Sequence, residues 1–92
     1  MIEEKKLPNG AGIRVSLPNA NLILLLGKKG FVMCGYLNLE AAEKLGDAAA
    51  IVTGVSTIEE ALNADVKKVT SKARELGVRE GMSGEEALKL LS

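Results

Sequence analysis

Cys34 is the only thiol of the chain, and it lies in the segment Phe31–Asn38, which reads FVMCGYLN. A cysteine acts as a nucleophile or a redox sensor when a nearby cation or a helix N-terminus lowers the pKa of its thiol. A helix that begins after Asn38 would have this effect, and so would Lys28 or Lys29 if either lies close. Cys34 is therefore the candidate catalytic residue of a cysteine-dependent enzyme or redox protein.

Cys34 also has an ordinary structural interpretation. The segment Phe31–Tyr36 is predicted to form a strand, and Val32, Cys34 and Tyr36 then share one of its faces. Free cysteines are usually buried and behave as small hydrophobic residues. The chain contains no histidine, which excludes Cys-His and Ser-His-Asp catalysis and all histidine-ligated metal sites within one chain. We therefore expect a buried Cys34 in preference to a catalytic one.

Two strand-to-helix junctions carry residues that suit the binding of a small anionic ligand. The first junction contributes Gly35, Tyr36 and Asn38, and the second contributes Thr53, Gly54, Ser56 and Thr57. Backbone N–H groups at the start of a helix attract anions, and a glycine lets a ligand approach the backbone. If the preceding strands are parallel neighbours, both junctions lie at their carboxyl ends, where ligands bind in open α/β sheets. The alternative, which we favour because caps are common, is plain capping by Asn38 and Thr57.

The first part of the chain is predicted to form an antiparallel meander. Residues 1–7 and 13–17 have strand patterns and are separated by turn residues. The continuous apolar run Leu22–Leu26 predicts a strand that is buried on both faces. A charged hairpin connection, residues 27–30, then leads into the strand Phe31–Tyr36.

Helical patterns begin after this strand. Asn38 is a good N-cap and Gly46 a good C-terminal stop, so the residues between them are predicted to form a helix. The apolar end of residues 47–53 then predicts another strand. The succession of strand, short helix and strand indicates a βαβ unit with a right-handed crossover and one parallel pair of strands.

The last third of the chain contains three helix signals. Thr57–Glu60 and Ser83–Glu86 have the pattern of capping boxes. Residues 65–70 fit either a helical face or an edge strand before a helix that Thr70 caps, and we expect the helix itself over residues 71–76. The predicted fold is α+β, with a mixed, mostly antiparallel sheet, one short βαβ crossover and helices packed on it. Residues 1–92 are expected to form a single α+β domain.

The composition indicates a small cytoplasmic protein that associates with itself. Of its 92 residues, 47% are apolar, and they are nearly all aliphatic. Because so small a domain buries only about 60% of its unfolded surface, we expect a homo-oligomer in which a second copy covers part of the aliphatic surface. The N-terminus is unlike a signal peptide, and a lone thiol fits a reducing compartment. The longest apolar run, Leu22–Leu26, is too short to cross a membrane.

Neither nucleic acid nor a cofactor is expected as a partner. The net charge is zero, and the chain has one Phe, one Tyr and no Trp, so it lacks both a dense positive field and aromatic stacking platforms. The loop Gly27–Gly30, which reads GKKG, lacks the spacing of a phosphate-binding loop and lies between two strands. No motif of the sequence indicates a cofactor or a metal site.

Three segments, Gly30–Asn38, Leu45–Val55 and Gly77–Leu88, carry a family resemblance. Together, and in this order, they resemble the YunC-like family of small bacterial and archaeal proteins, which is a domain of unknown function. The resemblance implies an α+β fold and a stand-alone cytoplasmic protein, and it assigns no reaction, substrate or catalytic residue. Three functions stay open: a binding module for a small anionic ligand, a cysteine-dependent enzyme or redox protein, and a structural or regulatory interaction protein.

Overall fold

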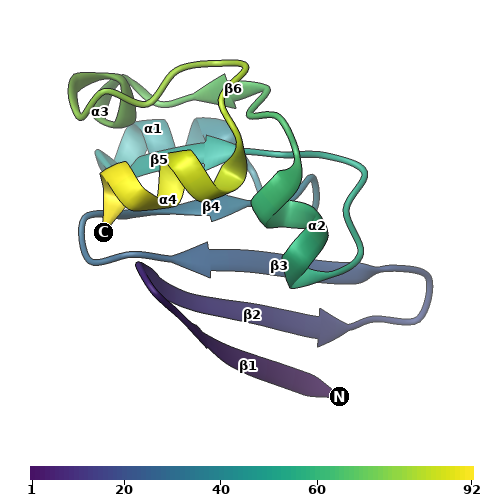
Figure 1. Cartoon of the computed structure of the whole chain (residues 1–92). Helices are drawn as coiled ribbons and strands as arrows, with labels where there is room; N and C mark the ends of the chain where they lie inside the picture. Colours follow the sequence, from purple (N-terminus) through teal and green to yellow (C-terminus); the bar gives the residue numbers. More distant parts are fainter.

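One mixed sheet organises the protein, whose computed structural model describes residues 1–92 (Figure 1). The strands are β1 (Ile2–Leu7), β2 (Gly10–Ser16), β3 (Asn21–Leu26), β4 (Gly30–Met33), β5 (Ala48–Ile51) and β6 (Lys68–Val69). They follow one another across the sheet in chain order. Every neighbouring pair is antiparallel except β4 and β5, which are parallel. The predicted α+β fold with one βαβ crossover is therefore confirmed.

Four helices complete the fold. They are α1 (Leu39–Leu45), α2 (Ile58–Asn63), α3 (Ser71–Glu75) and α4 (Gly84–Leu91). Helices α2 and α4 cover one face of the sheet, and α1, which joins β4 to β5, lies on the opposite face (Figure 1). None of the helices has the length and apolar character needed to cross a membrane.

The two faces of the sheet are buried to different extents. The major face carries Ile23, Leu25 and Val32 and packs against α2 and α4 in the main core. The minor face carries Leu24, Met33 and related residues, and α1 covers it over β4 and β5 only. The prediction that Leu22–Leu26 is buried on both faces was therefore wrong, because no helix covers the minor face of β3. Leu24 is only partly buried, and Leu26 is 39% exposed.

Strand β4 is shorter than predicted. The strand expected over Phe31–Tyr36 begins one residue earlier, at Gly30, and ends at Met33. The Cys34 N–H still donates to the Ile23 carbonyl, at 3.2 Å, but the Cys34 carbonyl accepts a hydrogen bond from the Leu37 N–H, also at 3.2 Å. This bond closes a turn through Gly35 and Tyr36, so the chain leaves the sheet before it enters α1.

Residues 65–70 adopt the edge-strand alternative. Lys68–Val69 form the short strand β6, which pairs with β5. Thr70 then caps α3, since its hydroxyl oxygen accepts a hydrogen bond from the Ala73 N–H at 3.3 Å. The same buried hydroxyl accepts from the Ala49 N–H at 3.0 Å and donates to the Asp47 carbonyl at 2.8 Å. Thr70 therefore ties α3 to the start of β5 as well as starting the helix.

Candidate functional site

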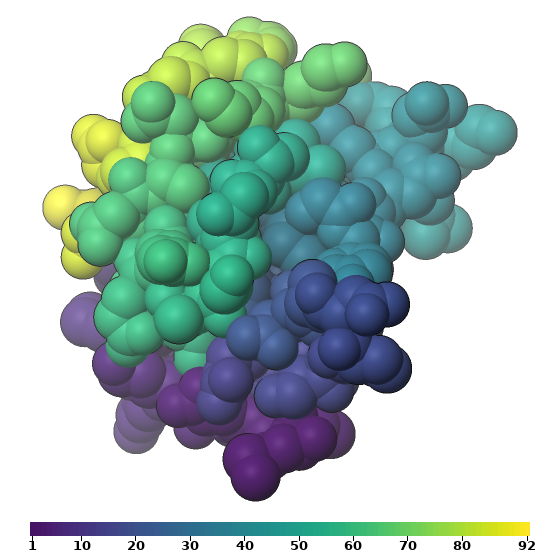
Figure 2. Space-filling view, turned by 90° about the vertical axis from the view of Figure 1, so that its right-hand side faces the viewer, coloured from purple at the N-terminus to yellow at the C-terminus, as the bar shows by residue number.

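A pocket lies at the carboxyl ends of β4 and β5, and we call it the junction pocket. It has a volume of about 330 Å³ and is lined by Ala20, Asn21, Cys34, Gly35, Tyr36, Gly54 and Val55. Its walls come from the β2–β3 connection, the β4–α1 junction and the β5–α2 junction, which lie side by side on one surface of the molecule (Figure 2). The parallel pairing of β4 and β5 brings both junctions to this edge, as the βαβ prediction required.

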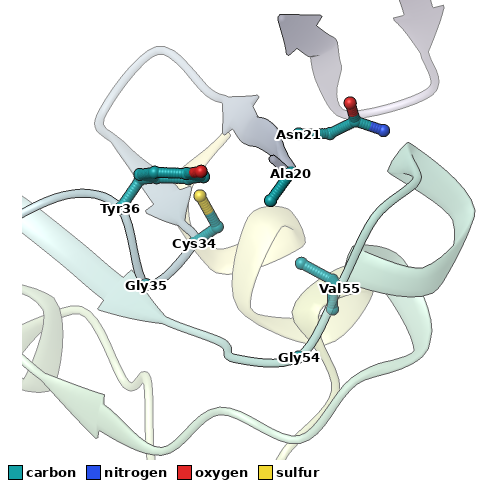
Figure 3. Close-up of a pocket in the computed structure, with 7 residues that line it drawn as sticks. All are labelled: Ala20, Asn21, Cys34, Gly35, Tyr36, Gly54 and Val55. Carbon is teal, nitrogen blue, oxygen red and sulfur yellow. The ribbon is translucent and has the colours of Figure 1, made fainter. Parts of the chain in front are cut away.

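Four residues singled out from the sequence meet in the junction pocket. They are Cys34, Gly35 and Tyr36 from the first junction and Gly54 from the second. The Cys34 side chain points into the space between Tyr36 and Ala20 (Figure 3). Tyr36 is 51% exposed, so its ring forms part of the rim.

Four residues that line the junction pocket have backbone N–H groups that the fold does not use. The N–H groups of Gly35, Tyr36, Gly54 and Val55 donate no hydrogen bond within the chain. Gly54 has φ of +71°, and a Cβ on it would meet no atom within 4 Å, so the backbone there is open to an approaching ligand. These groups bond to water or to a ligand, because a backbone N–H needs an acceptor.

Cys34 is buried, as its ordinary structural interpretation predicts. It is 3% exposed, and its Sγ accepts a hydrogen bond from the Ile23 N–H at 3.3 Å. The condition that Lys28 or Lys29 lies close to Cys34 is not met, because both lysines precede β4 whereas Cys34 follows it. The lysines therefore lie at the opposite end of the strand, and the junction pocket has no cationic side chain in its lining.

The other predicted residues lie beside the junction pocket and outside its lining. The Asn38 Oδ1 accepts hydrogen bonds from the N–H groups of Glu40, at 2.8 Å, and Ala41, at 3.3 Å, and so caps α1. The Thr57 hydroxyl caps α2 by accepting from the Glu60 N–H at 3.0 Å. The N–H groups of Glu40, Ala41 and Glu60 therefore already have acceptors and are not free to bind a ligand.

Ser56 and Thr53 connect the two junctions to their surroundings. The Ser56 N–H donates to the Glu60 carboxylate at 2.7 Å, so the reciprocal bond of the predicted capping box forms one residue before the cap. A Cβ added to Gly35 would lie 3.9 Å from the Thr53 Cγ2, which places the Thr53 side chain against the first junction. Both residues are exposed.

Three lining residues were not among the predicted site residues: Ala20, Asn21 and Val55, of which Val55 lies within the second junction. The Asn21 side chain donates from Nδ2 to the Ser56 carbonyl at 2.9 Å, which fastens the β2–β3 connection to the second junction. The sequence shows Asn21 only as part of a turn. Its contact with a segment 35 residues away depends on how the hairpin packs against the β5–α2 connection.

A second hollow adjoins the junction pocket at Tyr36. It has a volume of about 460 Å³ and is lined by Tyr36, Leu37, Asn38, Leu39, Glu40, Glu43 and Lys68. Tyr36 belongs to both linings. Two carboxylates and one ammonium group give this hollow mixed charge, so it does not attract anions as a purely basic site would.

The side chains with displaced pKa values lie outside both hollows. The hydrogen bond from Lys5 to Glu59 raises the pKa of Lys5 and lowers the pKa of Glu59. A hydrogen bond from Arg74 similarly lowers the pKa of Glu80. No group of three or more Cys, Asp or Glu side chains is arranged to hold a metal ion. The chemistry of the junction pocket therefore rests on backbone N–H groups, a thiol, a phenol and the Asn21 amide.

Comparison with known proteins identifies the family. Residues 33–91 match the family model described as "Domain of unknown function (DUF1805)". The chain is 38% identical over 80 residues to the uncharacterized protein YunC of Bacillus subtilis (strain 168), covering 83% of this chain and 79% of that protein. It is also similar to the crystal structure of the protein of unknown function TA1206 from Thermoplasma acidophilum, with a TM-score of 0.88 and 32% identity over 100% of this chain and 92% of that one. The sequence resemblance, the matched domain and these two relatives show that the chain belongs to the YunC-like family.

Proposed function

We propose that the protein is a binding module that holds a small anionic ligand in the junction pocket. One observation carries the proposal: four residues of the pocket lining have backbone N–H groups with no acceptor in the chain. A carboxylate or phosphate oxygen placed there receives hydrogen bonds from donors that are already positioned. No helix terminus is needed for this, which matters because Asn38 and Thr57 occupy the nearby helix starts.

The shape of the junction pocket supports a small ligand with an apolar part. Its volume of about 330 Å³ lies near the lower end of the roughly 300–1,000 Å³ typical of small-molecule sites. Ala20, Val55 and the Tyr36 ring offer an apolar wall beside the N–H donors. Because the lining lacks a cation, we expect modest affinity and a preference for a single anionic group over a polyphosphate.

An NMR titration tests the proposal directly. We expect phosphate, acetate or benzoate to cause saturable shifts of the amide signals of Gly35, Tyr36, Gly54 and Val55. The Gly46 N–H serves as an internal control, because it already donates to the Glu43 carbonyl at 3.1 Å. If no anion of the panel shifts the four signals in a saturable way, the proposed binding is contradicted.

A pair of variants locates the ligand. Ala20→Leu adds bulk at an exposed lining residue, so it fills part of the junction pocket without entering the core. Asn19→Leu adds an exposed leucine one residue earlier, outside the lining, and is the matched control. We expect Ala20→Leu to weaken binding at least about tenfold through steric exclusion, and Asn19→Leu to leave it unchanged. Equal affinities of the two variants would place the ligand elsewhere.

We also propose that residues 1–92 act as one domain, in the cytoplasm and as a homo-oligomer. Self-association is supported by exposed aliphatic side chains, notably Ile2 at 72% and Leu45 at 78% exposure. An unpaired thiol, Cys34, supports a reducing compartment. The alternative function as a structural or regulatory interaction protein depends on the same exposed surface. Light scattering over a range of concentrations tests self-association, and a mass that stays at one chain would contradict it.

A further inference from the structure

Strand β1 forms an open edge of the sheet. It pairs with β2 on one side only and is the outermost strand (Figure 1). Residues 2–6 are all exposed, and Leu7 at the end of the strand packs against the main core. Proline, a bulge or a covering loop commonly blocks such an edge, and β1 has none of these within its six residues. The edge is therefore sterically free to accept another strand.

The hydrogen-bonding groups of this edge alternate in a defined way. The Ser16 N–H donates to the Met1 carbonyl at 2.9 Å, so Met1 and Ser16 form a hydrogen-bonded antiparallel pair. In such a ladder every second residue bonds to the neighbouring strand and the residues between point their N–H and C=O groups away. Ile2, Glu4 and Lys6 therefore direct their backbone groups outward from the sheet.

The charges on β1 divide into two sets. Glu3 pairs with Arg14, at 2.9 Å, and Lys5 pairs with Glu59 of α2, so these charges have partners within the chain. Glu4 and Lys6 have no ion-pair partner in the chain, and both lie on the minor face, in register with β2 residues of that face. Glu4 and Lys6 therefore each combine outward-pointing backbone groups with a charge that has no ion-pair partner, and the two charges have opposite signs.

We propose that β1 pairs with β1 of a second copy of this chain, antiparallel and about a two-fold axis perpendicular to the sheet. In this register Glu4 lies opposite the partner's Lys6 and Lys6 lies opposite the partner's Glu4. Glu4 and Lys6 both lie at positions whose backbone groups point toward the partner strand. The interface therefore gains about four backbone hydrogen bonds as well as two ion pairs. The two sheets then form one continuous sheet, and the contact closes as a dimer.

The charges without a partner in the chain favour this register over the two adjacent ones. A two-fold axis perpendicular to the sheet leaves the minor faces of both copies on the same side. Neighbouring registers therefore differ by a shift of two residues. One adjacent register sets Glu4 opposite the partner's Glu4, and the other sets Lys6 opposite the partner's Lys6, so each brings together like charges that have no ion-pair partner in their own chain. The first of these also sets Glu3 opposite the partner's Lys5, but both charges already have partners within the chain. In the proposed register Lys5 faces the partner's Lys5 across the axis, on the other side of the sheet, where Glu59 of the same chain neutralises each ammonium group. Ile2, which is 72% exposed, then lies beside the partner's Pro8 and loses contact with water.

The inference rests on the self-association proposed above and is independent of ligand binding. Sedimentation velocity measures the dimer dissociation constant of three variants against the wild type. Lys6→Glu turns both ion pairs into Glu–Glu contacts, and we expect dissociation to become at least about tenfold easier. The double variant Glu4→Lys/Lys6→Glu restores two opposite-charge pairs in reversed order and is expected to dimerise like the wild type. Lys67→Glu makes the same charge change at an exposed residue away from β1 and is the matched control.

The possible results separate the two proposals. A wild type that stays a single chain at every concentration overturns both the β1 pairing and self-association. If the wild type is an oligomer and Lys6→Glu does not change its dissociation constant, the β1 pairing is overturned. Self-association then occurs through another surface. Loss of dimer in Lys6→Glu without recovery in the double variant also overturns the pairing. Circular dichroism of each variant tests whether the fold is intact, which we expect because Glu4, Lys6 and Lys67 are all exposed.

Discussion

At the residue scale, Cys34 belongs both to the main core and to the lining of the junction pocket. Its thiol reaches the junction pocket, yet it is 3% exposed and accepts a hydrogen bond from the Ile23 N–H. A reactive thiolate needs an electropositive surrounding, and no basic residue lines the pocket. The geometry therefore gives less support to the cysteine-dependent alternative than to ligand binding at the neighbouring N–H groups.

We expect a neutral aromatic disulfide reagent to modify native Cys34 slowly. Because the thiol is buried, its rate should be at least about tenfold below that of the same thiol in denaturant, where access is free. Absorbance of the released thiolate measures both rates. Native Cys34 reacting as fast as the unfolded thiol would revive the cysteine-dependent alternative.

The buried hydroxyl of Thr70 holds the start of α3 against β5 through three hydrogen bonds. We expect Thr70→Val to destabilise the protein by about 1–3 kcal/mol, because it keeps the side-chain volume but leaves the buried Ala49 N–H without its acceptor. Thr70→Ser, which keeps the hydroxyl, is the control and should lose much less stability. Urea unfolding measures both. If the valine and serine variants are equally stable, the three hydrogen bonds of the hydroxyl contribute little.

At the scale of elements, the close contact of α4 with α2 depends on a glycine. A Cβ on Gly84 would lie within 2.0 Å of the Ala61 carbonyl oxygen, so the two helices have no room for a side chain there. We expect Gly84→Ala to cost about 1–3 kcal/mol of stability through this overlap, although alanine is the better helix former. Gly35→Ala is the control, because its Cβ would meet only the Thr53 Cγ2, at 3.9 Å. Thermal unfolding should rank the two variants in this order.

The capping box of α4 gives a pH dependence with a defined sign. The Ser83 N–H donates to the Glu86 carboxylate at 2.9 Å, and this bond lowers the pKa of Glu86 below its ordinary value of 4.5. A carboxyl whose pKa is lower in the folded state stabilises the protein above its unfolded pKa and loses this effect as the pH falls through its folded pKa. Stability should therefore decline below about pH 4.5, and Glu86→Gln should show a smaller decline. An unchanged acid profile in the variant would assign the decline to other carboxyls, such as Glu59 and Glu80.

At the scale of the whole molecule, one face of the sheet is better covered than the other. Helices α2 and α4 cover the major face, whereas α1 covers the minor face over β4 and β5 only. If the protein self-associates as proposed, the β1–β3 part of the minor face and the β1 edge are the surfaces where a second copy would add most to stability.

If the protein self-associates as proposed, its melting temperature should rise with protein concentration. Dissociation accompanies unfolding in that case, so mass action favours the folded dimer at higher concentration. Scanning calorimetry over a wide concentration range measures the effect, and Lys6→Glu should reduce it. A concentration-independent melting temperature of the wild type would contradict a dimer that stabilises the fold.

Local signals predicted the elements well wherever a side chain acts on its own backbone. Asn38, Thr57 and Ser83 cap the helices that their sequence patterns indicate, and Gly46 ends α1 in a left-handed conformation with φ of 79°. Residues 65–70 were ambiguous because a two-residue strand has no periodicity of its own. Its pairing with β5, which lies elsewhere in the chain, resolves the ambiguity.

The sequence by itself determined the fold class, the βαβ unit, the helix caps and the preference for a buried Cys34, because period, cap chemistry and composition are local properties. Only the tertiary structure decided that β4 ends at Met33, that β3 is buried on one face, and that Asn21 meets the second junction. Those features depend on which segments pack against one another across many residues of chain. The junction pocket belongs to this second group. The residues of both junctions could be read from the sequence, but the parallel pairing of β4 with β5 brings the two junctions into one pocket lining.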